Sequence, residues 1–95
     1  MVTITERAAV QLQELLAANE APQGQGVKLV PDETGRIAMT IGPAGADDEV
    51  IEHDGEPLLI VDGRIAAMLE GAQLDCDTAE IGGERHVRWS LQPPS

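Results

Sequence analysis

Few side chains in this 95-residue chain could perform chemistry, and they are scattered along it. The chain has one thiol and two imidazoles, which are Cys76, His53 and His86. A zinc site would need these groups, or some of them with carboxylates, to meet at one point, yet no C-x-x-C or H-x-x-x-H spacing occurs. We interpret the two histidines as turn and surface residues and assign no metal ligand. His53, His86 and Cys76 are only weak candidates for a metal site.

The sequence around the thiol argues against reactivity. Cys76 lies between Asp75 and Asp77, and neighbouring anions raise a thiol pKa and so reduce the fraction of thiolate. In a strand, alternate side chains point to opposite faces, so the thiol points away from both carboxylates. We therefore predict that Cys76 is a small buried core residue. A metal bridged by Cys76 from two subunits is the alternative.

The carboxylates are numerous but lack the order of a metal loop. The run Asp47–Glu49, with Glu52, Asp54 and Glu56 close behind, could hold a hard cation through oxygen ligands. It does not follow the Asp-x-Asp-x-Asp-Gly order of a calcium-binding loop. We predict a solvated loop and strand edge here.

Catalytic motifs are also missing from the sequence. The two serines are Ser90 and Ser95, and the chain has no Gly-x-Ser-x-Gly element, phosphate-binding loop or dinucleotide fingerprint. An abundance of carboxylates in an acidic chain is not evidence for general acid–base catalysis. We expect that the protein is not an enzyme.

Charge and composition limit the partners. Seventeen acidic residues against six basic ones give a net charge of −11, which repels phosphate backbones and anionic lipids. We therefore expect no nucleic acid and no membrane as partner, and we expect a protein partner or a second copy of the chain. No apolar run approaches the roughly 20 residues of a membrane span, and no signal peptide is evident. A single domain in the cytoplasm, with residues 1–95 as its extent, is the resulting expectation.

The hydrophobic pattern predicts one helix followed by strands. Thr5 is a typical N-cap, and apolar residues at helical spacing predict an amphipathic helix over 6–19. A second, short helix is predicted over 64–70, ended by Gly71. The predicted strands are 2–4, 27–30, 37–41, 49–53, 57–61, 73–77 and 86–91. In the last strand Val87, Trp89 and Leu91 share one face, and we expect the single Trp to lie in the core.

The strongest pattern is the stretch 58–75, which reads LLIVDGRIAAMLEGAQLD. Its Val61-Asp62-Gly63-Arg64, Leu69-Glu70-Gly71 and Gln73-Leu74-Asp75 segments resemble the middle of the HesB/IscA family, the A-type iron–sulfur carriers. The opening Ile4–Ala9 and the segment Gly26–Leu29 match the family as well. The resemblance implies an α+β, HesB-like fold, a small mixed β-sandwich with one N-terminal amphipathic helix and one short helix. These motifs are turns, caps and core positions, so they indicate the fold rather than an activity.

The chain departs from the family at the ligand positions. The family places a Gly-Cys-x-Gly element after the strand that corresponds to 27–30, where this chain reads Pro31–Ile37 without a thiol. The family's Cys-x-Cys pair would follow Leu91, and residues 92–95 contain no cysteine. Clusters need thiolate ligands, so we expect no cofactor. The resulting hypothesis is a divergent, non-catalytic binding or accessory protein of iron–sulfur cluster assembly. The alternative is a metal-binding protein that uses His, Cys and carboxylate ligands.

Overall fold

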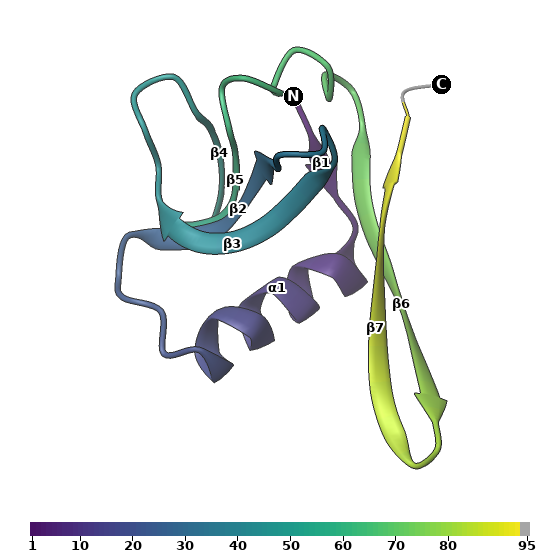
Figure 1. Ribbon diagram of the computed structural model, residues 1–95. Coiled ribbons are helices and arrows are strands. Elements are labelled where there is room, and N and C mark those ends of the chain that lie inside the picture. Colours follow the sequence, from purple (N-terminus) through teal and green to yellow (C-terminus); the bar gives the residue numbers. More distant parts are fainter. Residues whose placement is uncertain (94–95) are drawn as a thin grey trace.

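The computed structural model describes residues 1–93, so Pro94 and Ser95, the end of the predicted C-terminal tail, lie outside it. Within these residues one helix and two mixed sheets form the structure (Figure 1). In chain order the elements are β1 (Thr3–Ile4), α1 (Glu6–Ala18), β2 (Gln25–Pro31), β3 (Ile37–Pro43), β4 (Glu49–His53), β5 (Glu56–Val61), β6 (Gln73–Ile81) and β7 (Glu84–Gln92). In the described part of the chain, no helix is long and apolar enough to cross a membrane.

The strands form a four-stranded and a three-stranded sheet. The first has the order β3-β2-β5-β4, with β2 and β5 parallel and the other neighbours antiparallel. The second has the order β1-β6-β7, with β1 parallel to β6 and β6 antiparallel to β7. Helix α1 lies against the four-stranded sheet, and the long β6–β7 hairpin stands beside both (Figure 1). The predicted α+β architecture, with one N-terminal amphipathic helix and mixed sheets, is confirmed.

Helix α1 forms where its cap and its apolar stripe require it. The Thr5 hydroxyl accepts a hydrogen bond from the Ala8 amide at 3.2 Å, which satisfies one of the free N–H groups of the first turn. Ala8 and Leu12 are fully buried on the inner face. The helix ends at Ala18, with Asn19 as its C-cap, one residue before the predicted end.

The core lies between α1 and the two sheets. Strand β5 is buried along Leu58–Val61 because it has a neighbour on each side in the four-stranded sheet. Leu29 of β2 and Leu74 of β6 are also buried and extend this core from one sheet to the other. Between β4 and β5, Asp54 and Gly55 both have positive φ, which is the geometry of an Asp-Gly hairpin turn.

The predicted second helix is wrong: the segment 63–71 is a series of turns. The amides of Ile65 and Ala66 both donate to the Asp62 carbonyl at 3.0 Å, and the Leu69 amide donates to the Ile65 carbonyl at 3.2 Å. Too few consecutive bonds of one type form to offset the cost of starting a helix in so short a segment. Ile65 and Leu69 are nevertheless buried, and Gly71 ends the segment at φ 80°, so the apolar pattern was correct while the backbone form was not.

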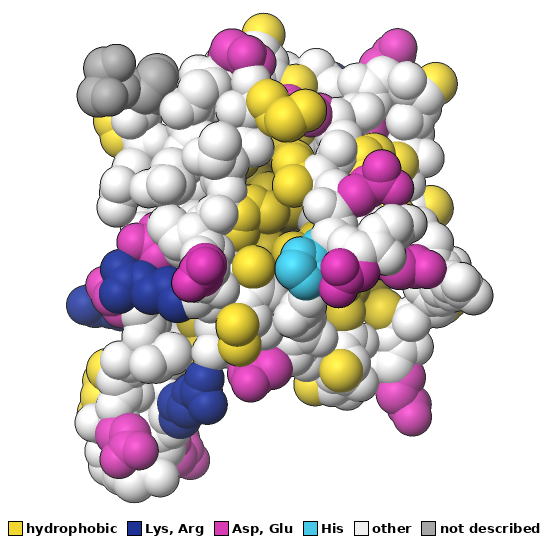
Figure 2. Space-filling model, turned by 180° about the vertical axis from the view of Figure 1, so that it is seen from behind, with side chains coloured by type: hydrophobic (Ala, Val, Ile, Leu, Met, Phe, Trp, Pro, Cys, Tyr) yellow, Lys and Arg dark blue, Asp and Glu magenta, His cyan; other side chains and the backbone are white. Residues whose placement is uncertain are grey.

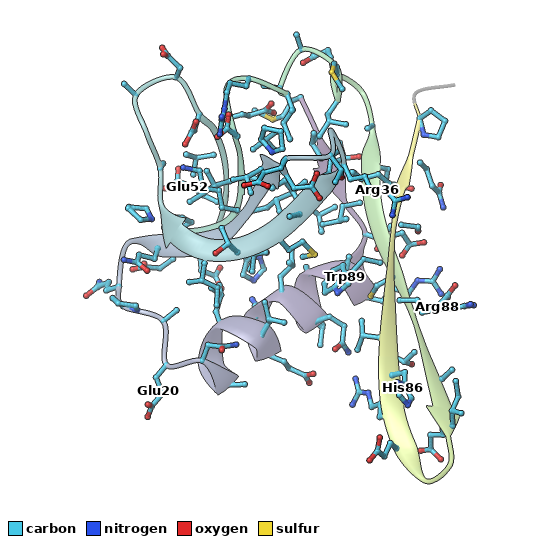
Figure 3. All side chains as sticks on the ribbon, in the orientation of Figure 1. Glu20, Arg36, Glu52, His86, Arg88 and Trp89 are labelled. Carbon is cyan, nitrogen blue, oxygen red and sulfur yellow. The ribbon has the colours of Figure 1, made fainter. Side chains whose placement is uncertain are left out.

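Strand β7 shows the predicted alternation, because Val87, Trp89 and Leu91 are partly buried and their neighbours are exposed. Trp89 points inward from β7, whereas Arg88 points away from the molecule (Figure 3). Trp89 packs against the core but is not fully buried. The single aromatic residue therefore closes one end of the core instead of occupying its centre.

Candidate functional site

The turn between β2 and β3 is the segment in which the resemblance described above would lead one to expect a cysteine, and it is closed by a carboxylate. One Asp32 oxygen, Oδ1, accepts from the Thr34 hydroxyl at 2.6 Å and from the amides of Thr34 and Arg36, each at 2.9 Å. These bonds, with that of the Thr34 hydroxyl first, hold the pKa of Asp32 below its usual value. The carboxylate is thus engaged in forming the turn, and the turn presents no thiol.

The thiol lies on β6, where Cys76 is the register partner of Trp89 on β7. Only 2% of Cys76 is exposed, and its Sγ donates to the Arg7 carbonyl at 3.5 Å. Burial, followed by the charge of Asp75, raises the pKa of the thiol. The prediction that Cys76 is a small buried core residue is confirmed, and the side chain that would bind a soft metal is covered.

A charged network joins the start of α1 to β6, and periodicity did not indicate it. Asp75, which is 7% exposed, accepts from the Thr5 hydroxyl and from Arg7 Nε and a terminal guanidinium nitrogen, all at 2.7 Å, and from the Cys76 amide at 2.8 Å. The hydrogen bond from the Arg7 guanidinium is the largest cause that holds the pKa of Asp75 far below its usual range. The same bond raises the pKa of Arg7. Asp75 therefore fixes the cap of α1 onto β6.

The histidines do not join the thiol. His86 on β7 is the register partner of Ala79, three pairs from the Cys76–Trp89 pair, and it lies beside Glu84 at 3.9 Å. An odd number of pairs places its side chain on the opposite face of the hairpin. His53 ends β4 in the other sheet and is half exposed. Among residues 1–93 no three His, Cys, Asp or Glu side chains are grouped to hold a metal ion.

The acidic loop before β4 contains a second charged network. Asp48 accepts from the Gly45 amide at 2.7 Å, from the Gly63 amide at 2.9 Å and from Lys28 Nζ at 2.9 Å. The bond from Lys28 is the largest cause that lowers the pKa of Asp48. Only 9% of its side chain is exposed, so the prediction of a solvated loop is wrong at Asp48. A long-range partner, Lys28, turns this carboxylate inward.

The Asp62 carboxylate, at the end of β5, completes this region. It accepts from the Arg64 amide at 2.8 Å and from the Arg64 guanidinium at 3.0 Å. The guanidinium is the first cause that lowers the pKa of Asp62 from 3.8 to about 2. Both carboxylates hold loops together, and both face a polar hollow of about 500 Å³. Because cations already neutralise Asp48 and Asp62, neither carboxylate is a free ligand for a metal ion.

Charge is unevenly distributed on the surface. Asp and Glu side chains are spread over the face seen in Figure 2, whereas Lys and Arg lie on the side of the β6–β7 hairpin. This face therefore presents mainly negative charge.

Comparison with solved structures gives the fold a precedent, although no protein-family model and no curated protein sequence matches the chain. The chain is similar to Escherichia coli SufA, described as involved in biosynthesis of iron–sulfur clusters, with a TM-score of 0.60 and 26% identity over 94% of this chain and 83% of SufA. It is similar in fold to IscA, solved with its [2Fe-2S] cluster, with a TM-score of 0.54 and 20% identity over 95% of this chain and 84% of IscA. The chain is thus a divergent relative, in fold, of the A-type iron–sulfur carriers of the HesB/IscA family, with one cysteine in its 95 residues.

Proposed function

We propose that this protein acts in iron–sulfur cluster biogenesis as a non-catalytic binding or accessory protein that does not itself hold a cluster. The likeness to SufA over nearly the whole chain supports the relation to cluster assembly. The inability to hold a cluster is supported by the β2–β3 turn, where Asp32 closes the loop that carries a cysteine in the family.

The available donors favour this role over that of a carrier. Iron in a cluster is held by thiolates, and substitution by carboxylates gives a harder site of lower affinity for the cluster. The thiol of Cys76 is buried on β6 and its pKa is raised. The Asp32 carboxylate is already bonded within its own turn. Neither group is free to replace the missing ligand.

An accessory protein works through a protein partner, and the charge of the chain indicates that the partner has a basic surface. A net charge of −11 attracts basic surfaces and repels phosphate groups and anionic lipids. We place this partner in the cytoplasm, where thiols and clusters are handled under reducing conditions. The partner is a second protein or a second copy of this chain.

Anaerobic reconstitution with ferrous iron and sulfide tests the cluster part of the proposal. IscA, which was solved with a [2Fe-2S] cluster, is treated in parallel as the positive control. After desalting, this protein should contain neither iron nor acid-labile sulfide in stoichiometric amount and should show no charge-transfer absorption. A visible cluster band that disappears in the Cys76→Ser variant would contradict the proposal, because it would make the buried thiol a ligand.

A further inference from the structure

The outer edge of β3 is an uncharged sheet edge. Strand β3 ends the four-stranded sheet, so one row of its N–H and C=O groups has no strand partner among residues 1–93. Natural proteins usually place charges on such edges to prevent pairing with other chains. The edge strands β4 and β7 carry charged residues and the edge strand β1 has only two residues, whereas β3 reads Ile-Ala-Met-Thr-Ile-Gly-Pro, with no charge and with Pro43 as its protective residue at one end.

An apolar groove runs beside this edge. Ile37, Met39 and Ile41 are partly buried on the inner side of β3. Met39 and Ile41 line a cavity of about 500 Å³ next to the C-terminal end of α1. Ile37 and Met39 line a second cavity of about 140 Å³, which Trp89 closes from β7. The edge and the groove together offer what an added strand needs, namely backbone groups to bond and pockets for alternate side chains.

The charges around the groove indicate its occupant. Asp32 and Glu33 lie in the turn before β3. Glu20 lies between two residues that line the larger cavity, and it projects at the end of α1 (Figure 3). Two cations lie close by: Arg36 directly precedes the strand, and Lys28, opposite Thr40 in the ladder, is neutralised by Asp48 at 2.9 Å. The edge therefore carries no charge along its length, has Asp32 and Glu33 in the turn before it, and has Glu20 at the α1 side of the groove.

We propose that β3 binds an extended segment of a partner protein, which adds to the sheet as a further strand. The segment has apolar residues at alternate positions, to fill the groove, and Lys or Arg at its ends, to meet the acidic residues. This inference rests on the accessory role proposed above and names the chemistry of the partner. The test of this inference uses no iron or sulfide. A negative result for peptide binding is therefore distinguishable from a negative result for the proposal that the protein holds no cluster.

The probe is a synthetic peptide, Lys-Lys-Val-Thr-Val-Thr-Val-Lys-Lys, with blocked ends, compared with a version in which every Lys is Glu. Binding is measured by isothermal titration and by the fluorescence of Trp89, the single tryptophan. Thr40 is exposed on β3, so Thr40→Lys and Thr40→Glu add charge at the edge without filling the core. Thr78→Lys, at an exposed position on β6, is the matched control.

The basic peptide should bind and shift the Trp89 emission, and the acidic peptide should not. Thr40→Lys should weaken binding about twofold, and Thr40→Glu should strengthen it by a similar factor, as expected for one unit charge about 10 Å away in water, because Thr40 lies three residues from either end of β3. Thr78→Lys should leave the affinity unchanged. The proposal is overturned if the basic peptide does not bind at about 1 mM, if the acidic peptide binds equally, or if both Lys variants act alike. A wild-type dimer that Thr40→Lys converts to monomer would also overturn it, because the occupant would then be a second copy.

Discussion

Truncation of Trp89 gives the most informative test of how the two sheets are held together. A Trp side chain buries up to about 250 Å², and Trp89 is only partly buried, at the edge of an existing cavity of about 140 Å³. Well over half of the side chain is buried, and two-thirds of a typical area of about 200 Å², at about 25 cal/mol per Å², corresponds to roughly 3 kcal/mol. The additional cavity term is small, because the space left by the ring opens to the cavity already present.

Trp89→Ala should therefore reduce the free energy of unfolding by about 3 kcal/mol, out of about 5–15 kcal/mol for a domain of this size. The variant should remain folded at room temperature. Its melting temperature should fall by roughly 12–24 °C, since 1 kcal/mol corresponds to about 4–8 °C in a domain of 60–100 residues. Urea unfolding followed by far-UV circular dichroism measures the loss, because the variant has no tryptophan to report by fluorescence.

Arg88→Ala is the matched control, because Arg88 is the neighbour on β7 whose exposed side chain points away from the molecule (Figure 3). This variant should change the free energy of unfolding by less than about 0.5 kcal/mol. If Trp89→Ala is equally mild, and native Trp89 emits like free tryptophan in water, then Trp89 does not face the core and the face of β7 that carries it is exposed to solvent.

Three further predictions concern the thiol and the loops. A thiol reagent should label Cys76 slowly in the folded protein and rapidly in denaturant, because only 2% of the residue is exposed; equal rates would mean that it is not buried. The pKa of Asp62 is lowered on folding from 3.8 to about 2, so its contribution to stability is complete above about pH 4 and is lost as the pH falls toward 2. The urea midpoint should fall over this range and fall less in Asp62→Asn, and identical profiles would refute the assignment. Gly63→Ala should destabilise the fold by about 1–3 kcal/mol, because the new Cβ would lie 2.7 Å from the Asp47 carbonyl oxygen. Gly42→Ala is the control in the same urea assay and should be mild, because nothing lies within 4 Å of its new Cβ. Equal losses of stability in the two variants would contradict the close approach at Gly63.

Local signals in the sequence were sufficient for most of the elements. The Thr5 cap and the stripe of Ala8 and Leu12 define α1, because caps and periodicity act within one or two turns. The Asp54-Gly55 turn sets its hairpin for the same reason. The segment 64–70 has the apolar spacing of a helix, but it lacks the length that would make a regular helix stable.

The charged networks could not be predicted from the sequence. Arg7 and Asp75 are 68 residues apart, and Asp48 and Gly63 are 15 residues apart. Periodicity and turn chemistry report on neighbours, whereas these contacts exist only after the sheets and loops have assembled. The absence of a thiol in the β2–β3 turn was visible in the sequence, but the bonds that occupy Asp32 required the structure.

One measurement tests the central claim most directly: whether the protein takes up a cluster from a cluster-loaded carrier. IscA carrying its [2Fe-2S] cluster is mixed anaerobically with this protein and sedimented, with absorbance recorded at the cluster band and at 280 nm. The two chains are then separated in high salt, which weakens contacts between surface charges, and iron and sulfide are assayed in each. We predict that all iron and sulfide are recovered on IscA. Recovery of a cluster on this protein would contradict the claim that it cannot hold one.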